Sequence, residues 1–302
     1  MRRLALGAAA LLLLAAGPAH PPLLGDEAWT EPSEALAHHL THAPPECLLR
    51  PDDAPLRSQI EIGRALFRSP TLLGGPAARL GLSCNACHLN GHSNARFFLP
   101  ELTDRPGAAD VTAEWASAVR GDGVMNPVPI PDLTGVSART AFGHKHVLSL
   151  TGFVTKVIEE EFQGEHPPPQ AFAGLIAYLR ALDPARCPPE AEQALTLAAA
   201  TDEVRRPLAA AQDADEATTR LLLLAAQEAL GRLAERLPQA RFAAEHKTLE
   251  GLARELGAMR AQARRPETGW TARFDALITE LGMQENKTYF NEAVLRQALV
   301  TR

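Results

Sequence analysis

The residues best suited to chemistry lie in one short run. Residues 83–88 read S-C-N-A-C-H, so two thiols lie three positions apart and an imidazole follows the second thiol directly. Thiols at this spacing can reach the two vinyl groups on one edge of a haem, and the adjacent imidazole can bind the iron. With four Cys and ten His in 302 residues, chance gives about 0.002 such runs. We therefore expect one haem c attached through Cys84 and Cys87, with His88 as iron ligand.

Two other kinds of site use the same residue types. A redox-active dithiol would explain Cys84 and Cys87. Such dithiols are typical of thioredoxin-like chains with a βαβ pattern, and this sequence lacks that pattern. A zinc site would need two further ligands at a fitting spacing, and there is no second C-x-x-C. Haem attachment is the interpretation that uses all three residues.

The sixth iron ligand decides what such a haem could do. An iron with two protein ligands exchanges electrons, whereas an iron with an open position can bind peroxide or a gas. Met125, in a loop rich in Gly and Pro, and His144 are the leading candidates for this ligand. His146 and an open or water-bound position remain as alternatives.

Three basic residues and one tryptophan have two interpretations each. Arg96, Arg120 and Lys145 could pair with haem propionates, because buried carboxylates need a cation, or could be solvated. Trp115 could lie on an electron path or simply belong to the core.

Apolar residues at helical spacing predict the elements that position these residues. We expect helices over 56–68, 112–119, 147–162 and 170–182, joined by loops rich in Gly and Pro. Beyond residue 190 wide apolar faces must pack on one another, which predicts a helical bundle. The helices expected in that bundle span 190–200, 203–212, 215–237, 242–264, 271–282 and 290–300.

The expected fold class is all-α, a cytochrome c-like haem domain followed by a C-terminal helical bundle. Met1-Arg2-Arg3 and the apolar run Leu4 to Ala16 resemble a signal peptide, which indicates export to the periplasm without stable membrane insertion after cleavage. An uncleaved anchor is the alternative. The expected regions are a signal peptide at 1–19, an irregular leader at 20–55, a mono-haem domain at 56–187 and an α-helical bundle at 190–302.

The two remaining cysteines flank the expected haem domain. Cys47 precedes it and Cys187 follows its last helix, and domain ends usually lie close together. In an oxidising compartment we expect these two cysteines to form a disulfide. Two unpaired or intermolecular thiols are the alternative.

Several runs resemble bacterial di-haem cytochrome c peroxidases and their MauG-like relatives. Residues 60–70, I-E-I-G-R-A-L-F-R-S-P, and the C-x-x-C-H run are similar to the start of a haem domain in this family. Residues 130–136 and 140–146 are similar to its P-x-L-x-x-V and A-P-Y-x-H-D-G stretches, and 175–182 to a closing helix. The resemblance, which covers about residues 56–186, implies the fold of one haem domain.

Two departures separate the chain from that family. The family enzymes have two haem motifs, whereas this chain has one, and Lys145-His146 replaces the Asp-Gly of H-D-G. The family's axial Met or Tyr comes from the helix after that stretch, and residues 147–162 contain neither. The resemblance therefore implies the fold without the peroxidase activity.

Charge and motif together define the expected function. The formal net charge of −6 provides no basic surplus for phosphates, so nucleic-acid binding is not expected. The leading hypothesis is a periplasmic mono-haem cytochrome that transfers single electrons between redox partner proteins. The alternatives are a peroxidase-like haem oxidoreductase with an open distal site, and a sensor or binding protein that contains haem.

Overall fold

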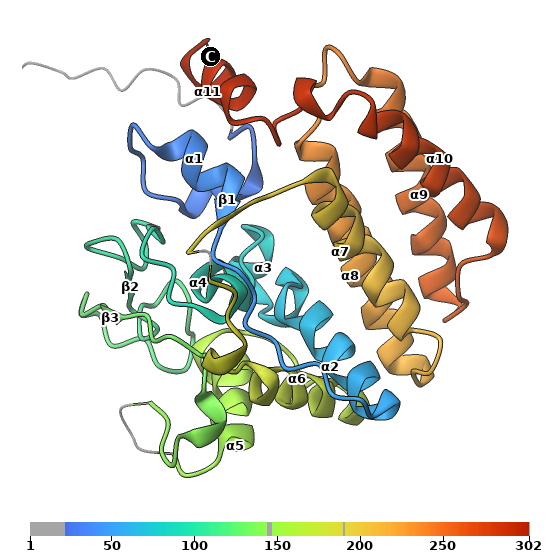
Figure 1. Ribbon diagram of the computed structural model, residues 1–302. Coiled ribbons are helices and arrows are strands. Elements are labelled where there is room, and N and C mark those ends of the chain that lie inside the picture. The colour runs from blue at the N-terminus through green and yellow to red at the C-terminus, as the bar shows by residue number, and fades with distance from the viewer. Residues whose placement is uncertain (1–21, 144–146, 190, 302) are drawn as a thin grey trace, which may run out of the picture.

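The computed structural model describes residues 22–143, 147–189 and 191–301. It is mostly helical, with 55% helix and 6% strand, which agrees with the expected all-α class. Figure 1 shows helices α2 and α6 in the lower centre, helices α7 to α10 on the right, and helices α1 and α11 at the top left.

Helices α2 (Ala54–Phe67) and α6 (Pro169–Ala181) form the centre of the first half. The Asp53 side chain caps α2 by accepting a hydrogen bond from the Leu56 amide at 2.7 Å. The two helices cross where glycines face each other, since a Cβ on Gly63 would lie 1.9 Å from the Gly174 carbonyl oxygen. Both helices lie where the sequence predicts them.

Short elements surround this helix pair. Helix α5 (Leu150–Lys156) continues into a π-helical turn, Val157–Glu161. The other short α-helices here are α3 (Gly75–Arg79) and α4 (Cys84–Cys87). Strands β2 (Ala108–Ala109) and β3 (Val128–Pro129) pair antiparallel. The 3-10 turns of the structure are Gly25–Trp29, Pro70–Leu72, Leu89–Gly91, Val136–Ala138, Pro184–Arg186 and Glu285–Lys287.

Two apolar clusters fill this half. One, which we name the α2/α6 core, includes Ile60, Leu66, Phe67, Leu150, Ile158, Phe172, Leu175 and Ile176. The other, which we name the loop core, includes Leu73, Leu82, Phe97, Leu99, Leu102 and Ile130. Both provide the burial of apolar surface that stabilises a chain segment otherwise rich in loops.

Two expected helices of this half differ in the structure. Residues 112–119 form a series of turns, because the Asp110 side chain accepts hydrogen bonds from the amide and hydroxyl of Thr112 and so competes with helix formation. The helix expected over 147–162 begins at Leu150, where Ser149 caps it, and residue Val147 pairs instead with Phe142.

Four helices form the bundle of the second half. Their bounds are α7 (Leu197–Ala210), α8 (Glu216–Glu235), α9 (Ala243–Ala261) and α10 (Thr268–Gly282). Their shared core includes Leu223, Leu230, Leu233, Leu252, Leu256, Trp270, Phe274 and Leu281. Helices α7 and α8 also contact α2, so the bundle packs directly against the first half.

The prediction of separate helices at 190–200 and 203–212 is wrong. A short strand, β4 (Gln193–Ala194), comes first, and then α7 runs as one helix from its Thr196 cap. Pro207 lies inside α7, where it removes one backbone hydrogen bond without ending the helix.

The leader is more ordered than expected. It contains helix α1 (Leu36–Thr41) and strand β1 (His42–Ala43), which pairs with β4. The final helix, α11 (Glu292–Thr301), packs on α1 instead of joining the bundle. Their shared cluster consists of Leu24, Ala37, Leu40 and Leu295. The prediction of an irregular leader is therefore wrong for residues 36–41, since buried apolar contacts stabilise this short helix.

A buried ionic network joins the two halves. Glu46 accepts hydrogen bonds from Arg64 (2.8 Å), Arg68 (2.8 Å) and Tyr178 (2.8 Å), and Arg64 also pairs with Glu203 of α7 at 2.6 Å. Burial alone would raise the pKa of Glu46, but the charges of Arg68 and Arg64 and the hydrogen bonds from Arg64 and Tyr178 outweigh it. They hold the pKa of Glu46 well below its usual range.

No helix within the described ranges combines the length and apolar character that a membrane span requires.

Candidate functional site

Cys84 and Cys87 are the first and last residues of the four-residue helix α4. Both are free thiols and both are partly exposed. The amide of His88 donates to the Cys84 carbonyl oxygen at 2.9 Å, which closes the turn, and the backbone of His88 then leaves the helix with φ −116° and ψ 68°. The motif is therefore a single helical turn followed by an imidazole that starts a new chain direction.

The His88 ring is oriented by a backbone carbonyl. Its Nδ1 lies 3.0 Å from the carbonyl oxygen of Pro131. A carbonyl can only accept a hydrogen bond, so Nδ1 carries the proton in the neutral ring and Nε2 keeps its lone pair. Histidines that bind metals are usually held in this way, with the other ring nitrogen donating to a carbonyl or a carboxylate. His88 is thus prepared to bind a metal through Nε2.

Burial controls the protonation of the motif. It lowers the pKa of His88 to about 4, although the hydrogen bond to Pro131 and the charge of Asp132 act in the opposite direction. Burial also raises the pKa of the Cys84 and Cys87 thiols to about 12. At neutral pH the imidazole is neutral and both sulfurs are protonated. Reactive dithiols have a lowered thiol pKa, so these pKa directions disfavour a dithiol oxidoreductase.

The motif is also not arranged around a metal ion of its own. Among the described residues, the groups of three His, Cys, Asp or Glu whose ligand atoms lie within 4.8 Å of one another are found elsewhere. A zinc site needs its ligand atoms to converge on one point. The described residues therefore do not assemble a zinc site around the motif.

Apolar side chains surround the two thiols. Cys84 packs against both the α2/α6 core and the loop core, and Cys87 packs against the loop core. Trp115 is partly buried and packs against the loop core, which favours its interpretation as a core residue. Apolar walls of this kind would exclude water from a bound porphyrin and influence its potential.

Asn94 fixes the turn that carries the motif with one side-chain and one backbone hydrogen bond. The side chain of Asn94 donates to the carbonyl oxygen of Ala86 through Nδ2 at 2.7 Å. The backbone amide of Asn94 donates to the Cys87 carbonyl oxygen at 2.9 Å. These two bonds satisfy carbonyls at the end of α4 that have no partner inside the helix. Just beyond, Gly91 has φ +91°, and a Cβ there would lie 2.9 Å from Leu182.

Asn90 links this turn to the buried ionic network. Its backbone amide donates to Asn85 Oδ1 at 2.9 Å, and its side-chain Nδ2 donates to the Pro44 carbonyl oxygen at 2.7 Å. Its Oδ1 accepts from Arg68 at 2.7 Å. The turn with the C-x-x-C-H motif, the leader and α2 are thereby fixed relative to one another.

Of the candidate sixth ligands, the structure describes Met125. Met125 lies in the loop before β3 and is 51% exposed. That loop is anchored beside it, where the Asn126 amide donates to Asp110 Oδ2 at 3.1 Å. His144, Lys145 and His146 lie outside the described residues.

Arg96 and Arg120 already have partners in the protein. Arg96 donates to the carbonyl oxygens of His39 and His42, at 3.2 Å each, and pairs with Glu192. Arg120 pairs with Glu160 and Glu161 of the π-helical turn. These contacts favour structural roles for both arginines over neutralisation of haem propionates.

Cys47 and Cys187 form a disulfide, with an S–S distance of 2.03 Å. Cys47 is buried and Cys187 is exposed. Beside them, the Asp183 amide donates to the Cys47 carbonyl oxygen at 2.8 Å. This is the expected pairing, and it links the segment before α2 to the segment after α6.

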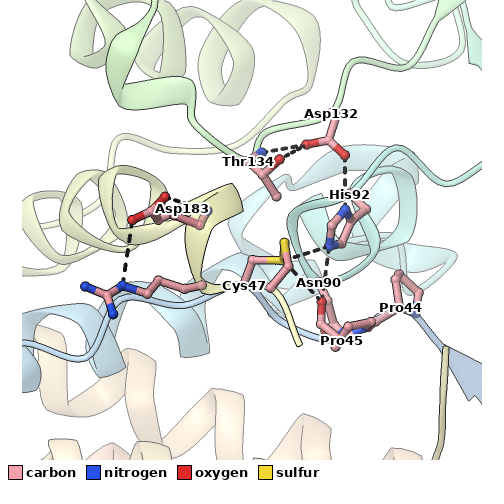
Figure 2. The surroundings of a disulfide bond; sticks show 11 residues. Pro44, Pro45, Cys47, Asn90, His92, Asp132, Thr134 and Asp183 are labelled. Carbon is pink, nitrogen blue, oxygen red and sulfur yellow. Dashed lines mark hydrogen bonds and ion pairs between the residues drawn. A yellow bond between two sulfur atoms is a disulfide. The ribbon is translucent and has the colours of Figure 1, made fainter. Parts of the chain in front are cut away.

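Figure 2 shows a histidine directly beside this disulfide. The Nε2 of His92 lies 3.3 Å from the Cys47 sulfur and 3.1 Å from the Pro45 carbonyl oxygen, and its Nδ1 lies 3.1 Å from Asp132 Oδ2. Asp132 follows Pro131, the residue whose carbonyl orients His88. The loop that orients His88 is therefore also bonded to the surroundings of the disulfide.

Sequence reasoning missed Pro131 and Asp132 as site residues. Asp132 Oδ1 accepts from the amide (2.7 Å) and the hydroxyl (2.5 Å) of Thr134, a local turn that the spacing Asp-x-Thr could have indicated. No local pattern indicates that the Pro131 carbonyl meets an imidazole 43 residues earlier in the chain.

No protein-family model, curated protein or solved structure matches this chain.

Proposed function

We propose that the chain is an exported c-type cytochrome with one covalently attached haem, and that it carries single electrons between redox partner proteins in the periplasm. The observation that carries this proposal is the contact between His88 Nδ1 and the Pro131 carbonyl oxygen, beside two free thiols one helical turn apart. It supports a neutral His88 whose Nε2 is available as the axial ligand. A bound haem c supplies reversible one-electron chemistry at its iron.

The chain's own residues would hold and shield that group. Cys84 and Cys87 would attach it, and the α2/α6 core and the loop core would form its apolar walls. Among the described residues, four of the exposed large apolar side chains fall between 119 and 148. They are Val119, Val124, Met125 and Leu148. A bound porphyrin has the apolar area to cover exposed side chains of this kind.

A second candidate function is a peroxidase-like haem oxidoreductase. The exposure of Met125 favours it, because a methionine that stays in solvent does not occupy the sixth position. The two candidates therefore differ in one chemical fact, which is whether a protein side chain occupies the sixth position.

Visible spectra of the full-length chain and two variants separate these candidates. For the electron carrier we expect a low-spin reduced spectrum that carbon monoxide does not change. We expect the spectrum to become sensitive to carbon monoxide in either Met125→Ala or His144→Ala. Met283→Ala is the matched control, since Met283 is also exposed (76%) but follows the bundle helix α10. A wild-type protein that binds carbon monoxide and reacts rapidly with peroxide would establish the second candidate, and a chain without haem would exclude both.

A further inference from the structure

A second group of metal-binding side chains lies away from the haem motif, between helices α1 and α11. His38 and His42 are four residues apart on the chain, and their rings stack with centroids 4.1 Å apart and an interplanar angle of 22°. His38 lies in α1 and His42 directly follows that helix, and the stacking places both imidazoles on the same side. Glu292, the first residue of α11, faces them from the other end of the chain.

The three side chains converge. Glu292 Oε2 lies 3.0 Å from His38 Nδ1 and 3.9 Å from His42 Nδ1, and one ligand atom from each residue lies within 4.8 Å of the others. In a tetrahedral zinc site with bonds of about 2.0 Å, neighbouring ligand atoms are about 3.3 Å apart. Small rotations of these side chains therefore reach zinc geometry, with water completing the coordination.

A carboxylate lies beside the second ring nitrogen of His38. His38 Nε2 lies 3.1 Å from Glu192 Oε2, and Glu192 is itself paired with Arg96. Histidines that bind zinc commonly donate their second ring nitrogen to a carboxylate, which fixes the ring and strengthens the ligand. His38 thus has the partner expected of a zinc ligand on each of its two nitrogens.

His42 must adopt one tautomer to take part. Its Nδ1 also lies 3.3 Å from the His38 carbonyl oxygen and 3.1 Å from the Thr41 hydroxyl, so metal binding requires the proton on Nε2. Glu292 is likewise shared, since Arg296 of the same helix pairs with it. The side chains of His38, His42 and Glu292 are 39%, 25% and 29% exposed, so an ion can reach them from solvent.

We propose that His38, His42 and Glu292 bind one zinc-class divalent cation that joins the N-terminal helix α1 to the C-terminal helix α11. Two imidazoles and one carboxylate favour zinc over magnesium or calcium, which prefer sites made of oxygen ligands. The site joins segments 254 residues apart in the sequence, so metal binding would stabilise the packing of α1 against α11. The proposal does not depend on haem attachment.

Titration calorimetry with zinc chloride on the chelator-treated full-length protein tests the site. We expect one equivalent of zinc to bind, no comparable binding of magnesium or calcium, and a melting temperature that rises with zinc concentration. X-ray absorption should report nitrogen and oxygen ligands at about 2.0 Å, without sulfur. The intact disulfide keeps Cys47 and Cys187 from contributing ligands.

Substitutions then assign the ligands. His42→Ala and Glu292→Gln should each weaken zinc binding at least 100-fold, and Glu192→Gln should weaken it about 10- to 100-fold, as loss of a supporting carboxylate does. His166→Ala is the matched control, because His166 pairs with Glu159, does not belong to this cluster and is 49% exposed. Circular dichroism checks that each variant folds. Failure of the wild-type protein to bind one zinc ion would overturn the proposal, as would unchanged affinity in both His42→Ala and Glu292→Gln.

Discussion

At the scale of single residues, His88 shows which site property the sequence can predict and which depends on the fold. Its place directly after Cys87 predicts an iron ligand, because haem attachment needs that order of residues. The carbonyl that orients its ring belongs to Pro131, 43 residues away, and depends on how the loop returns across the core. Sequence can therefore identify the candidate ligand, whereas its tautomer follows only from the fold.

Glu46 makes the strongest prediction at this scale. It lies among Arg64, Arg68 and Tyr178, and its side chain is 13% exposed. Glu46→Gln therefore removes a negative charge that balances two buried guanidinium groups. We expect this substitution to lower the free energy of unfolding by about 3 kcal/mol at pH 7, measured by urea denaturation. Glu216→Gln is the control, since Glu216 is 69% exposed and should change stability by less than about 0.5 kcal/mol.

The pH dependence of the same pair of proteins gives a second readout of Glu46. The pKa of Glu46 is lower in the folded protein than its ordinary value of 4.5. The ionised carboxylate therefore contributes fully to the free energy of unfolding above pH 4.5, and this contribution is lost as the pH falls below 4.5. The stability difference between wild type and Glu46→Gln should therefore shrink below about pH 4.5. A difference that stays constant down to pH 3 would contradict this account of the network.

At the scale of elements, apolar spacing identifies long helices and fails for short ones. The sequence locates α2 and α6 within about two residues, because each has a broad apolar face. It misses α1, whose six residues are stabilised by contact with α11 rather than by local preference. It wrongly predicts a helix at 112–119, where Asp110 forms a competing turn.

The crossing of α2 and α6 is a testable feature at this scale. Gly63→Ala would put a Cβ 1.9 Å from the Gly174 carbonyl oxygen, so the helices would have to separate. We expect a loss of about 3 kcal/mol in the free energy of unfolding.

Gly231→Ala is the matched control for this substitution. Gly231 also lies inside a helix, α8, but its added Cβ would meet nothing within 4 Å. That change should stabilise the protein by about 0.5–1 kcal/mol, because alanine is the better helix former. Equal effects of the two substitutions in urea denaturation would show that the close crossing is not what makes Gly63 necessary.

At the scale of the whole molecule, α2 connects the two halves. It packs against α6 on one side and against α7 and α8 on the other, and Glu61 of α2 pairs with Arg206 of α7 at 2.6 Å. The sequence predicts the helical bundle from its apolar faces, but a polar contact such as this one has no local signature. The position of α11 beside α1 was equally inaccessible, because it depends on contacts between opposite ends of the chain.

The Cys47–Cys187 disulfide should be a major contributor to the stability of this arrangement. It closes a loop of 140 residues, which in the chain-entropy model is worth about 5 kcal/mol. The double substitution Cys47→Ser with Cys187→Ser should lower the free energy of unfolding by up to that amount in denaturant titrations. Haem attachment should persist in this variant, since Cys84 and Cys87 are unchanged. Unaltered stability of the double variant would contradict the assigned role.

The central claim is the covalent attachment of haem to Cys84 and Cys87, and mass spectrometry of the exported protein tests it most directly. The wild-type chain should be coloured and heavier than its polypeptide by the mass of one haem. The variant with both Cys84→Ser and Cys87→Ser should have the polypeptide mass alone. A colourless wild-type protein with an unmodified mass, obtained from cells that mature other c-type cytochromes, would contradict the account.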